Sequence, residues 1–384
     1  MCIRDRANAD RPHLTVVGRP FEGTQELAEL QRELLAGAFD VVAIDVGFTE
    51  GEAFQSYVNS KDELTLDFVA TCGAFGWSPV EGLAWIEALR KLEKKPTIVG
   101  IGVGSSTSMS QEALKLLEKL LPETQARSEL VLYPLCTDGV HGRPRYYQLS
   151  ENQRGVLRYG LGEVRDLLMD QRENEPLPNM EKEYARCQRL LDALQQYEEA
   201  MRFEIEAGDE DPRGRILATN VKNALKDRPA GTRALALVRQ RDLARASDAT
   251  SFVAKLAQMD GPTTTCLGVA VGSAVFRAYD PNDHEGGPLA PRDVVLTAET
   301  TTILERALRD ASKTSAWFDL RDAPRDGLVA GWFAAPRALR SSGLTCGGPV
   351  ETPWDHRVLG DFDALLWMPS VARAAATPEK ASGH

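Results

Sequence analysis

The sequence predicts an α/β fold with a mostly parallel central sheet, flanking helices and an inserted helical lobe. Two observations support this prediction. Apolar, strand-like runs at residues 13–17 and 39–47 enclose one amphipathic segment of helix length, which is the pattern of a βαβ unit with parallel strands. From about residue 150 to residue 226, Glu, Arg, Gln and Leu recur with the spacing of long amphipathic helices.

The first half of the chain continues this alternation of helices and strands. Helical spacing over residues 52–92 is interrupted at 71–79, where Gly, Pro and aromatic residues accumulate. A third strand is expected at 97–103, because this run is apolar and β-branched. A helix should begin near residue 111, and a short strand is expected at 129–135.

Beyond the lobe, helical and strand-like periodicities alternate again. We expect helical structure over 232–259, a buried strand at 263–276, a helix at 300–311, and strands at 316–320 and 364–368. These elements predict three parts: a first α/β portion at 13–149, the helical lobe at 150–230, and a second α/β portion at 231–370 that completes the sheet.

The bulk composition is that of a soluble globular protein. Of the 384 residues, 43% are hydrophobic and 26% are charged, so the chain can bury a sizeable core. The net charge of −11 argues against nucleic acid or an anionic membrane as a partner, because phosphates require a basic surface. We therefore expect a small-molecule ligand or substrate, a monomer, and neither a nucleic-acid nor a membrane partner.

The cysteines and the termini bear on compartment and processing. Six cysteines are scattered without a Cys-x-x-Cys pair, which is typical of reduced, buried thiols. We expect a cytoplasmic protein without metal or cofactor. Residues 1–6 carry charge without a following apolar core, so they do not form a signal peptide. We expect the true start to be truncated or replaced, and residues 1–12 and 371–384 to be disordered or non-native.

Several motifs together resemble the erythromycin esterase family. The first strand of that family runs into a Gly-Glu-Ala-Thr-His-Gly-Thr loop, which matches residues 18–24, and its second strand ends in a Glu at the position of Asp45. The resemblance continues through Trp77-Ser-Pro, residues 85–90 and the segment from Phe318 to Pro324. It implies the fold predicted above and the hydrolysis of ester bonds of the macrolide lactone type, an activity linked to antibiotic resistance.

The residues that the family uses for chemistry are substituted in this chain. Arg19 stands at the position of the loop Glu, and Glu22 stands at the position of the loop His. The His-Asn-x-His segment of the family falls on residues 269–272, which carry no titratable side chain, and the Asp after the third strand is replaced by Gly102. The imidazoles that would act as bases are therefore missing from the matched positions.

The resemblance nevertheless defines a candidate site. Glu22 and Asp45 are the candidate catalytic carboxylates, and like-charge coupling between them could raise one pKa toward neutrality. A Glu beside Arg19 should instead be a poorer base, because the cation favours its ionised form. Candidate binding residues are Arg19, Arg241, Asp242 and Trp77, the last of which either lines an apolar site or seals the core.

Two histidines outside the matched positions are candidate replacements for the lost imidazoles. His141 follows Asp138 in a turn-rich loop, and His284 lies in a loop rich in carboxylates that lacks metal-ligand spacing. Each is either a displaced functional histidine or a surface loop residue.

Two functions of different class follow. The favoured one is an esterase-like protein that is catalytically impaired or inactive, a pseudoenzyme that keeps the fold for small-molecule binding. The alternative is a hydrolase with a rebuilt carboxylate site that uses Glu22 and Asp45 as acid and base.

Overall fold

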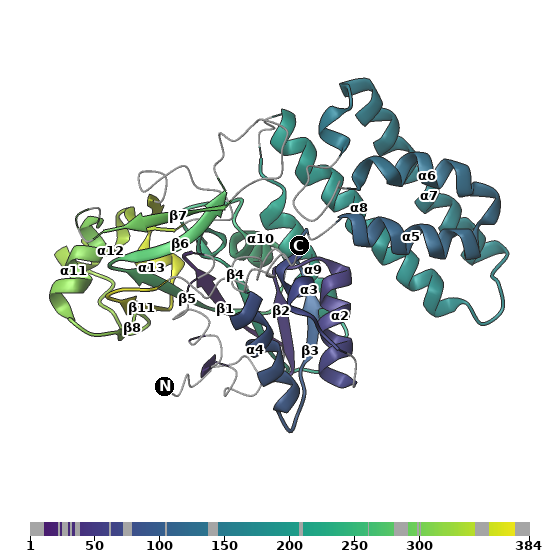
Figure 1. The fold of residues 1–384 in the computed structure, drawn as a ribbon. Coiled ribbons are helices and arrows are strands. Elements are labelled where there is room, and N and C mark those ends of the chain that lie inside the picture. The colour runs from purple at the N-terminus through teal and green to yellow at the C-terminus, as the bar shows by residue number, and fades with distance from the viewer. Residues whose placement is uncertain are drawn as a thin grey trace, which may run out of the picture.

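The computed structural model describes most of the chain (Figure 1). The described residues are 11–21, 24, 30, 33–34, 39–60, 63–71, 79–103, 106–136, 145–206, 210–259, 261–279, 291–297, 299, 301–341 and 353–372. Within these ranges no helix is long and apolar enough to cross a membrane.

The central sheet has seven strands in the order β3-β2-β4-β1-β5-β11-β8. All neighbouring strands are parallel except β8, which runs antiparallel to β11 at one edge. The predicted α/β fold with a mostly parallel sheet is therefore confirmed. The strands are β1 (His13–Arg19), β2 (Val41–Ile44), β3 (Thr97–Gly100), β4 (Arg233–Arg239), β5 (Thr263–Val271), β8 (Ala316–Asp319) and β11 (Ala364–Met368).

Helices cover both faces of this sheet, as buried parallel strands require. Along β4, Leu235 and Leu237 face one core, while Ala234 and Ala236 face the other. The first core is closed by α2 (Phe48–Asn59), α3 (Leu66–Thr71) and α4 (Pro79–Lys91). The second core is closed by α9 (Arg213–Leu225), α10 (Phe252–Gln258), α11 (Ile303–Ala311) and α13 (Val358–Asp361).

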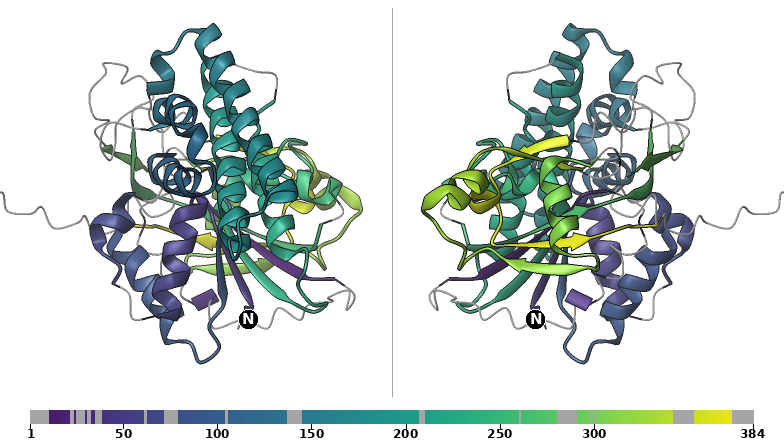
Figure 2. Two further views of the ribbon diagram at one scale, coloured as in Figure 1. Left: turned by 90° about the vertical axis from the view of Figure 1, so that its right-hand side faces the viewer. Right: turned by 90° about the vertical axis from the view of Figure 1, so that its left-hand side faces the viewer.

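A helical lobe stands beside the sheet with a hydrophobic core of its own (Figures 1 and 2). Its core contains Leu157, Leu161 and Val164 from one long helix and Leu190 and Leu194 from another. The two shorter helices that precede them pack into the same core. The lobe therefore consists of α5 (Ser106–Leu120), α6 (Gln125–Leu132), α7 (Glu151–Asn174) and α8 (Glu181–Glu206).

Ion pairs connect the lobe to the sheet domain. Arg186 on α8 contacts Glu52 on α2 at 3.0 Å and Glu112 on α5 at 3.2 Å. The lobe is thus held both by its own core and by charged contacts to α2.

Helix α7 begins with a capping box, in which the hydroxyl of Ser150 accepts from the backbone N–H of Gln153.

Smaller elements complete the second half of the chain. Strands β6 (Ala274–Tyr279) and β7 (Pro291–Leu296) form one antiparallel hairpin, and β9 (Arg337–Arg340) and β10 (Pro353–His356) form another. Helix α12 (Gly327–Ala334) precedes β9. Val371 is buried and forms a bridge with Ala274, so ordered structure extends past β11.

Three sequence-based element predictions were wrong. Residues 129–135 are helical and belong to α6 and to a 3₁₀ turn at Tyr133–Leu135. Within 232–259, the apolar run that forms β4 is buried on both faces, and periodicity alone cannot distinguish such a run from a buried helix. The single strand expected at 263–276 divides into β5 and β6. Between them Gly272 packs against Pro369, where an added Cβ would lie 2.4 Å from the carbonyl oxygen of Pro369.

The described cysteines agree with the expectation of reduced thiols. Cys136, Cys187 and Cys266 are free, and burial raises the pKa of the Cys187 and Cys266 thiols to about 12. Cys2, Cys72 and Cys346 lie outside the described residues.

A buried ion pair secures the end of β5. Arg340 and Glu305 are both 0% exposed, and Arg340 Nε donates to Glu305 Oε2 at 2.7 Å. The same guanidinium donates to the carbonyl oxygens of Val271 and Gly272, each at 2.7 Å. Arg340 thus supplies donors to buried backbone carbonyls at the end of β5.

We predict that Arg340→Met lowers the free energy of unfolding by about 3–5 kcal/mol, because it leaves the Glu305 carboxylate buried without its cation. Urea unfolding followed by circular dichroism measures the loss. The double variant Arg340→Met, Glu305→Leu removes both charges and should recover part of the stability. A single variant as stable as the wild type would contradict a structural role for the pair.

Candidate functional site

The carboxyl ends of three neighbouring strands bring charged side chains together. Arg19 is the last residue of β1, Arg239 is the last residue of β4, and Asp45 directly follows β2. Arg19 and Arg239 face each other in the register of β1 and β4. Because β4 lies between β1 and β2, all three residues lie at the carboxyl ends of adjacent strands. We call this end of the sheet the carboxyl edge; it is where α/β proteins bind ligands.

The first residue of α9 connects these strand ends. Arg213 contacts the carboxylate of Asp45 through a short hydrogen bond and donates to Asp242 Oδ2 at 3.2 Å. Arg19 approaches the same carboxylate oxygen, with its guanidinium 3.9 Å from Asp45 Oδ2. We call Arg19, Asp45, Arg213, Arg239 and Asp242 the arginine–aspartate cluster.

The cluster fixes the protonation state of its central carboxylate. Burial alone would raise the pKa of Asp45, but the guanidinium groups of Arg213, Arg239 and Arg19 outweigh this effect and lower the pKa to about 2. Burial would likewise lower the pKa of Arg213, yet Asp242 and Asp45 raise it above the usual arginine value. Asp45 is therefore ionised and weakly basic near neutral pH.

Asp242 and Arg241 lie on a 3₁₀ turn, η4 (Gln240–Leu243), directly after β4. The carboxylate of Asp242 also accepts from the backbone N–H of Arg239 at 3.1 Å, which ties the turn to the strand end. Arg241 lies at the outer side, 3.8 Å from Asp211 and with its guanidinium 5.5 Å from the ring centre of Trp354. Arg241 thus stacks on an aromatic ring that is 41% exposed.

Gly102, the position that the resemblance assigns to the family Asp after the third strand, packs directly against Asp45. A Cβ atom at residue 102 would lie 2.4 Å from Asp45 Oδ1 and 3.0 Å from the carbonyl carbon of Asp45. Any other residue at this position would therefore collide with the carboxylate that Arg213 holds. The glycine is required by the packing of the cluster.

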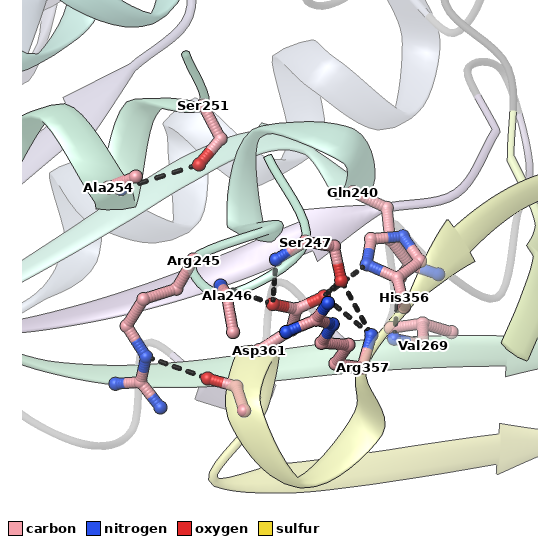
Figure 3. A network of polar contacts seen from close by, with 11 residues as sticks. Gln240, Arg245, Ala246, Ser247, Ser251, Ala254, Val269, His356, Arg357 and Asp361 are labelled. Atoms are coloured by element: carbon pink, nitrogen blue, oxygen red, sulfur yellow. Dashed lines mark hydrogen bonds and ion pairs between the residues drawn. The ribbon is translucent and has the colours of Figure 1, made fainter. Parts of the chain in front are cut away.

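A second polar network holds the segment that follows η4 (Figure 3). The buried carboxylate of Asp361 accepts from the backbone N–H groups of Ala246 at 2.6 Å, Ser247 at 3.1 Å and Arg357 at 3.1 Å. The hydroxyl of Ser247 donates to the same carboxylate at 2.7 Å, and His356 Nδ1 lies 3.1 Å from it. The network joins the segment after η4 to α13 and thereby supports the turn that carries Arg241 and Asp242.

This network contains Ser, His and Asp but is not a catalytic triad. Ser247 and His356 both bond to Asp361, whereas a triad requires the serine hydroxyl to bond to the imidazole. The Ser247 hydroxyl also accepts from the backbone N–H of Arg357 at 2.6 Å, and His356 is 0% exposed against the ring of Phe362. These side chains position the backbone.

The described histidines lie away from the arginine–aspartate cluster. His13 is at the amino end of β1, where its ring nitrogens lie 3.3 Å from Thr263 Oγ1 and 3.1 Å from Thr265 Oγ1. His356 belongs to the Asp361 network. Among the residues that the structure describes, no imidazole therefore stands at the carboxyl edge near Asp45.

The predicted site residues fall into three groups. Arg19, Asp45 and Asp242 come together in the cluster, and Arg241 lies beside it on η4. Glu22, Trp77, His141 and His284 lie outside the described residues.

Sequence reasoning missed Arg213 and Arg239. Arg239 ends an apolar run, and reading that run as a strand would have placed this arginine at the carboxyl edge. No local motif indicates Arg213, because its role depends on where α9 begins relative to β2.

The fold is shared with solved structures of low sequence identity. A protein from Bacillus cereus matches with a TM-score of 0.71 and 14% identity, over 94% of this chain and 89% of the other. A succinoglycan biosynthesis protein matches with a TM-score of 0.70 and 14% identity, over 96% of this chain and 90% of the other. A mutant of the erythromycin esterase EreC in its open conformation matches with a TM-score of 0.72 and 14% identity, over 96% of this chain and 92% of the other.

The sheet order and the carboxyl-edge site place this protein in the α/β class, and the family comparison narrows the class further. The erythromycin esterase family matches residues 36–371, so the chain belongs to that family. The resemblance noted in the sequence is confirmed. A comparison with curated proteins found none of significant similarity.

The low pKa of Asp45 predicts an acid-sensitive contribution to stability. The pKa falls from 3.8 in the unfolded chain to about 2 in the folded protein, so the unfolded chain binds more protons between these values. The contribution of about 2 kcal/mol is present above about pH 4 and is lost as the pH falls toward 2. We expect the stability difference between wild type and Asp45→Asn to shrink between about pH 4 and pH 2 in urea unfolding. A constant difference would contradict the ion-paired state.

We predict that Gly102→Ala destabilises the protein by about 1–3 kcal/mol, because the added methyl group displaces the Asp45 carboxylate from Arg213. Gly162→Ala is the matched control, since a Cβ at this position on α7 meets no atom within 4 Å. The control should be stabilised by about 0.5–1 kcal/mol through helix propensity. Urea midpoints measure both changes, and a stabilised Gly102→Ala would show that the cluster tolerates the side chain.

Proposed function

We propose that this member of the erythromycin esterase family is a small-molecule binding protein with little or no ester hydrolase activity. The observation that carries the proposal is the ion pairing of Asp45 with Arg213. The carboxylate at the end of β2, the position that the resemblance assigns to the family Glu, is neutralised by arginines from α9 and β1.

The chemistry of ester hydrolysis supports this proposal. Activation of a water molecule requires a base whose pKa lies near the operating pH. A carboxylate with a pKa of about 2 is a weak base at neutral pH, and its lone pairs point toward guanidinium groups. The described carboxyl edge also lacks an imidazole that could take over this role.

The alternative hydrolase would need Glu22 and Asp45 to share a proton so that one of them became basic. The arginines around Asp45 favour its ionised form and thus oppose such sharing. A role in antibiotic resistance through lactone hydrolysis, which the resemblance implies, would require this rebuilt chemistry. We therefore favour a small-molecule binding function over ester hydrolysis.

Hydrolysis assays with purified protein test the proposal. With small chromogenic esters and with erythromycin, we expect the rate to stay at that of buffer, and Asp45→Asn to leave it unchanged. Asp40→Asn is the matched control, because Asp40 precedes the same strand at the opposite edge of the sheet. Turnover above buffer that disappears in Asp45→Asn or in Glu22→Gln, but not in Asp40→Asn, would establish the carboxylate hydrolase instead.

A further inference from the structure

The guanidinium group of one arginine at the carboxyl edge contacts no described carboxylate directly. Arg239 is partly buried at the end of β4, and its backbone N–H donates to Asp242. Within the described ranges, its guanidinium group makes no hydrogen bond or ion pair.

The neighbouring arginines differ from Arg239, because each of them has an acidic partner. Arg19 and Arg213 contact Asp45, Arg213 also contacts Asp242, and Arg241 lies 3.8 Å from Asp211. Of these four arginines, Arg239 is the one whose guanidinium has no direct acidic partner among the described residues, although Asp45 and Asp242 act on it electrostatically.

The surroundings of Arg239 disfavour its charge in the free protein. Burial and the nearby Arg213 lower its pKa to about 10, and Asp45 only partly opposes them. An anion bound beside the guanidinium would remove this cost and would stabilise the folded state. Guanidinium groups suit this role, because their planar fork donates two parallel hydrogen bonds to an oxyanion.

We propose that Arg239 binds the oxyanion of an anionic small-molecule ligand, a carboxylate or a phosphate, with Arg213 and Arg241 beside it. The inference rests on the proposed binding function and specifies the class of its ligand. A small anion fits better than a polyanion, because the protein carries a net charge of −11 and the positive charge is local. The location at the carboxyl ends of central parallel strands is where such ligands bind in α/β folds.

Thermal unfolding of the full chain tests this assignment. The probes are inorganic phosphate and benzoate, compared with sodium chloride at equal ionic strength and with benzamide as the neutral analogue of benzoate. We expect at least one of the two anions to raise the Tm by about 2 °C and benzamide to have no effect. A response to phosphate alone identifies a phosphate ligand, and a response to benzoate alone identifies a carboxylate ligand.

Variants at the two ends of β4 locate the effect. Arg239→Gln should abolish the Tm shift, and Arg239→Lys, which keeps the charge but loses the fork, should reduce it. Arg233→Gln, at the opposite end of the same strand, should retain the full shift. The proposal is overturned if neither anion shifts the wild type, or if Arg239→Gln and Arg239→Lys respond like the wild type.

Ester hydrolysis measured on the same samples separates this inference from the proposed function. Turnover together with an Arg239-dependent shift would overturn the binding-only function and support the anion site. Absence of both would support loss of hydrolysis and overturn the anion site.

Discussion

The contact of Arg213 with Asp45 and Asp242 is the interaction on which the arrangement of the site depends. One guanidinium group joins the start of α9, the end of β2 and the turn after β4. A largely buried arginine is stabilised here because two carboxylates compensate for its lost hydration. The close approach of Gly102 to Asp45 is a consequence of this arrangement, since the carboxylate occupies the space above residue 102.

The charged residues at the carboxyl edge compensate one another. Arginine at residue 19 and aspartate at residue 45 form a compensated pair, and Arg213 completes it from a different part of the chain. Such pairing favours the ionised form of Asp45. The hydrophobic cores lie on the two faces of the sheet and do not involve these charged residues.

The fold class could be predicted from the sequence, because β1, β2 and β11 are short apolar runs bounded by polar residues. The β4 segment could not, since its run of buried residues from Ala234 to Val238 shows no alternation. The residues of the cluster that belong to short sequence motifs, such as Arg19 and Asp45, could be predicted. Arg213 could not be predicted, because its contact with Asp45 spans 168 residues of sequence and depends on tertiary packing.

The strand order also governs how the chain must assemble during synthesis. The first strand, β1, does not pair with β2 but lies between β4 and β5, which are encoded in the second half of the chain. Both of its hydrogen-bonding edges therefore have no native strand partner until most of the protein has left the ribosome. Unpaired apolar strand edges promote association between chains. The nascent chain therefore carries an unpaired strand until β4 and β5 are made, although β1 lies in the interior of the final sheet.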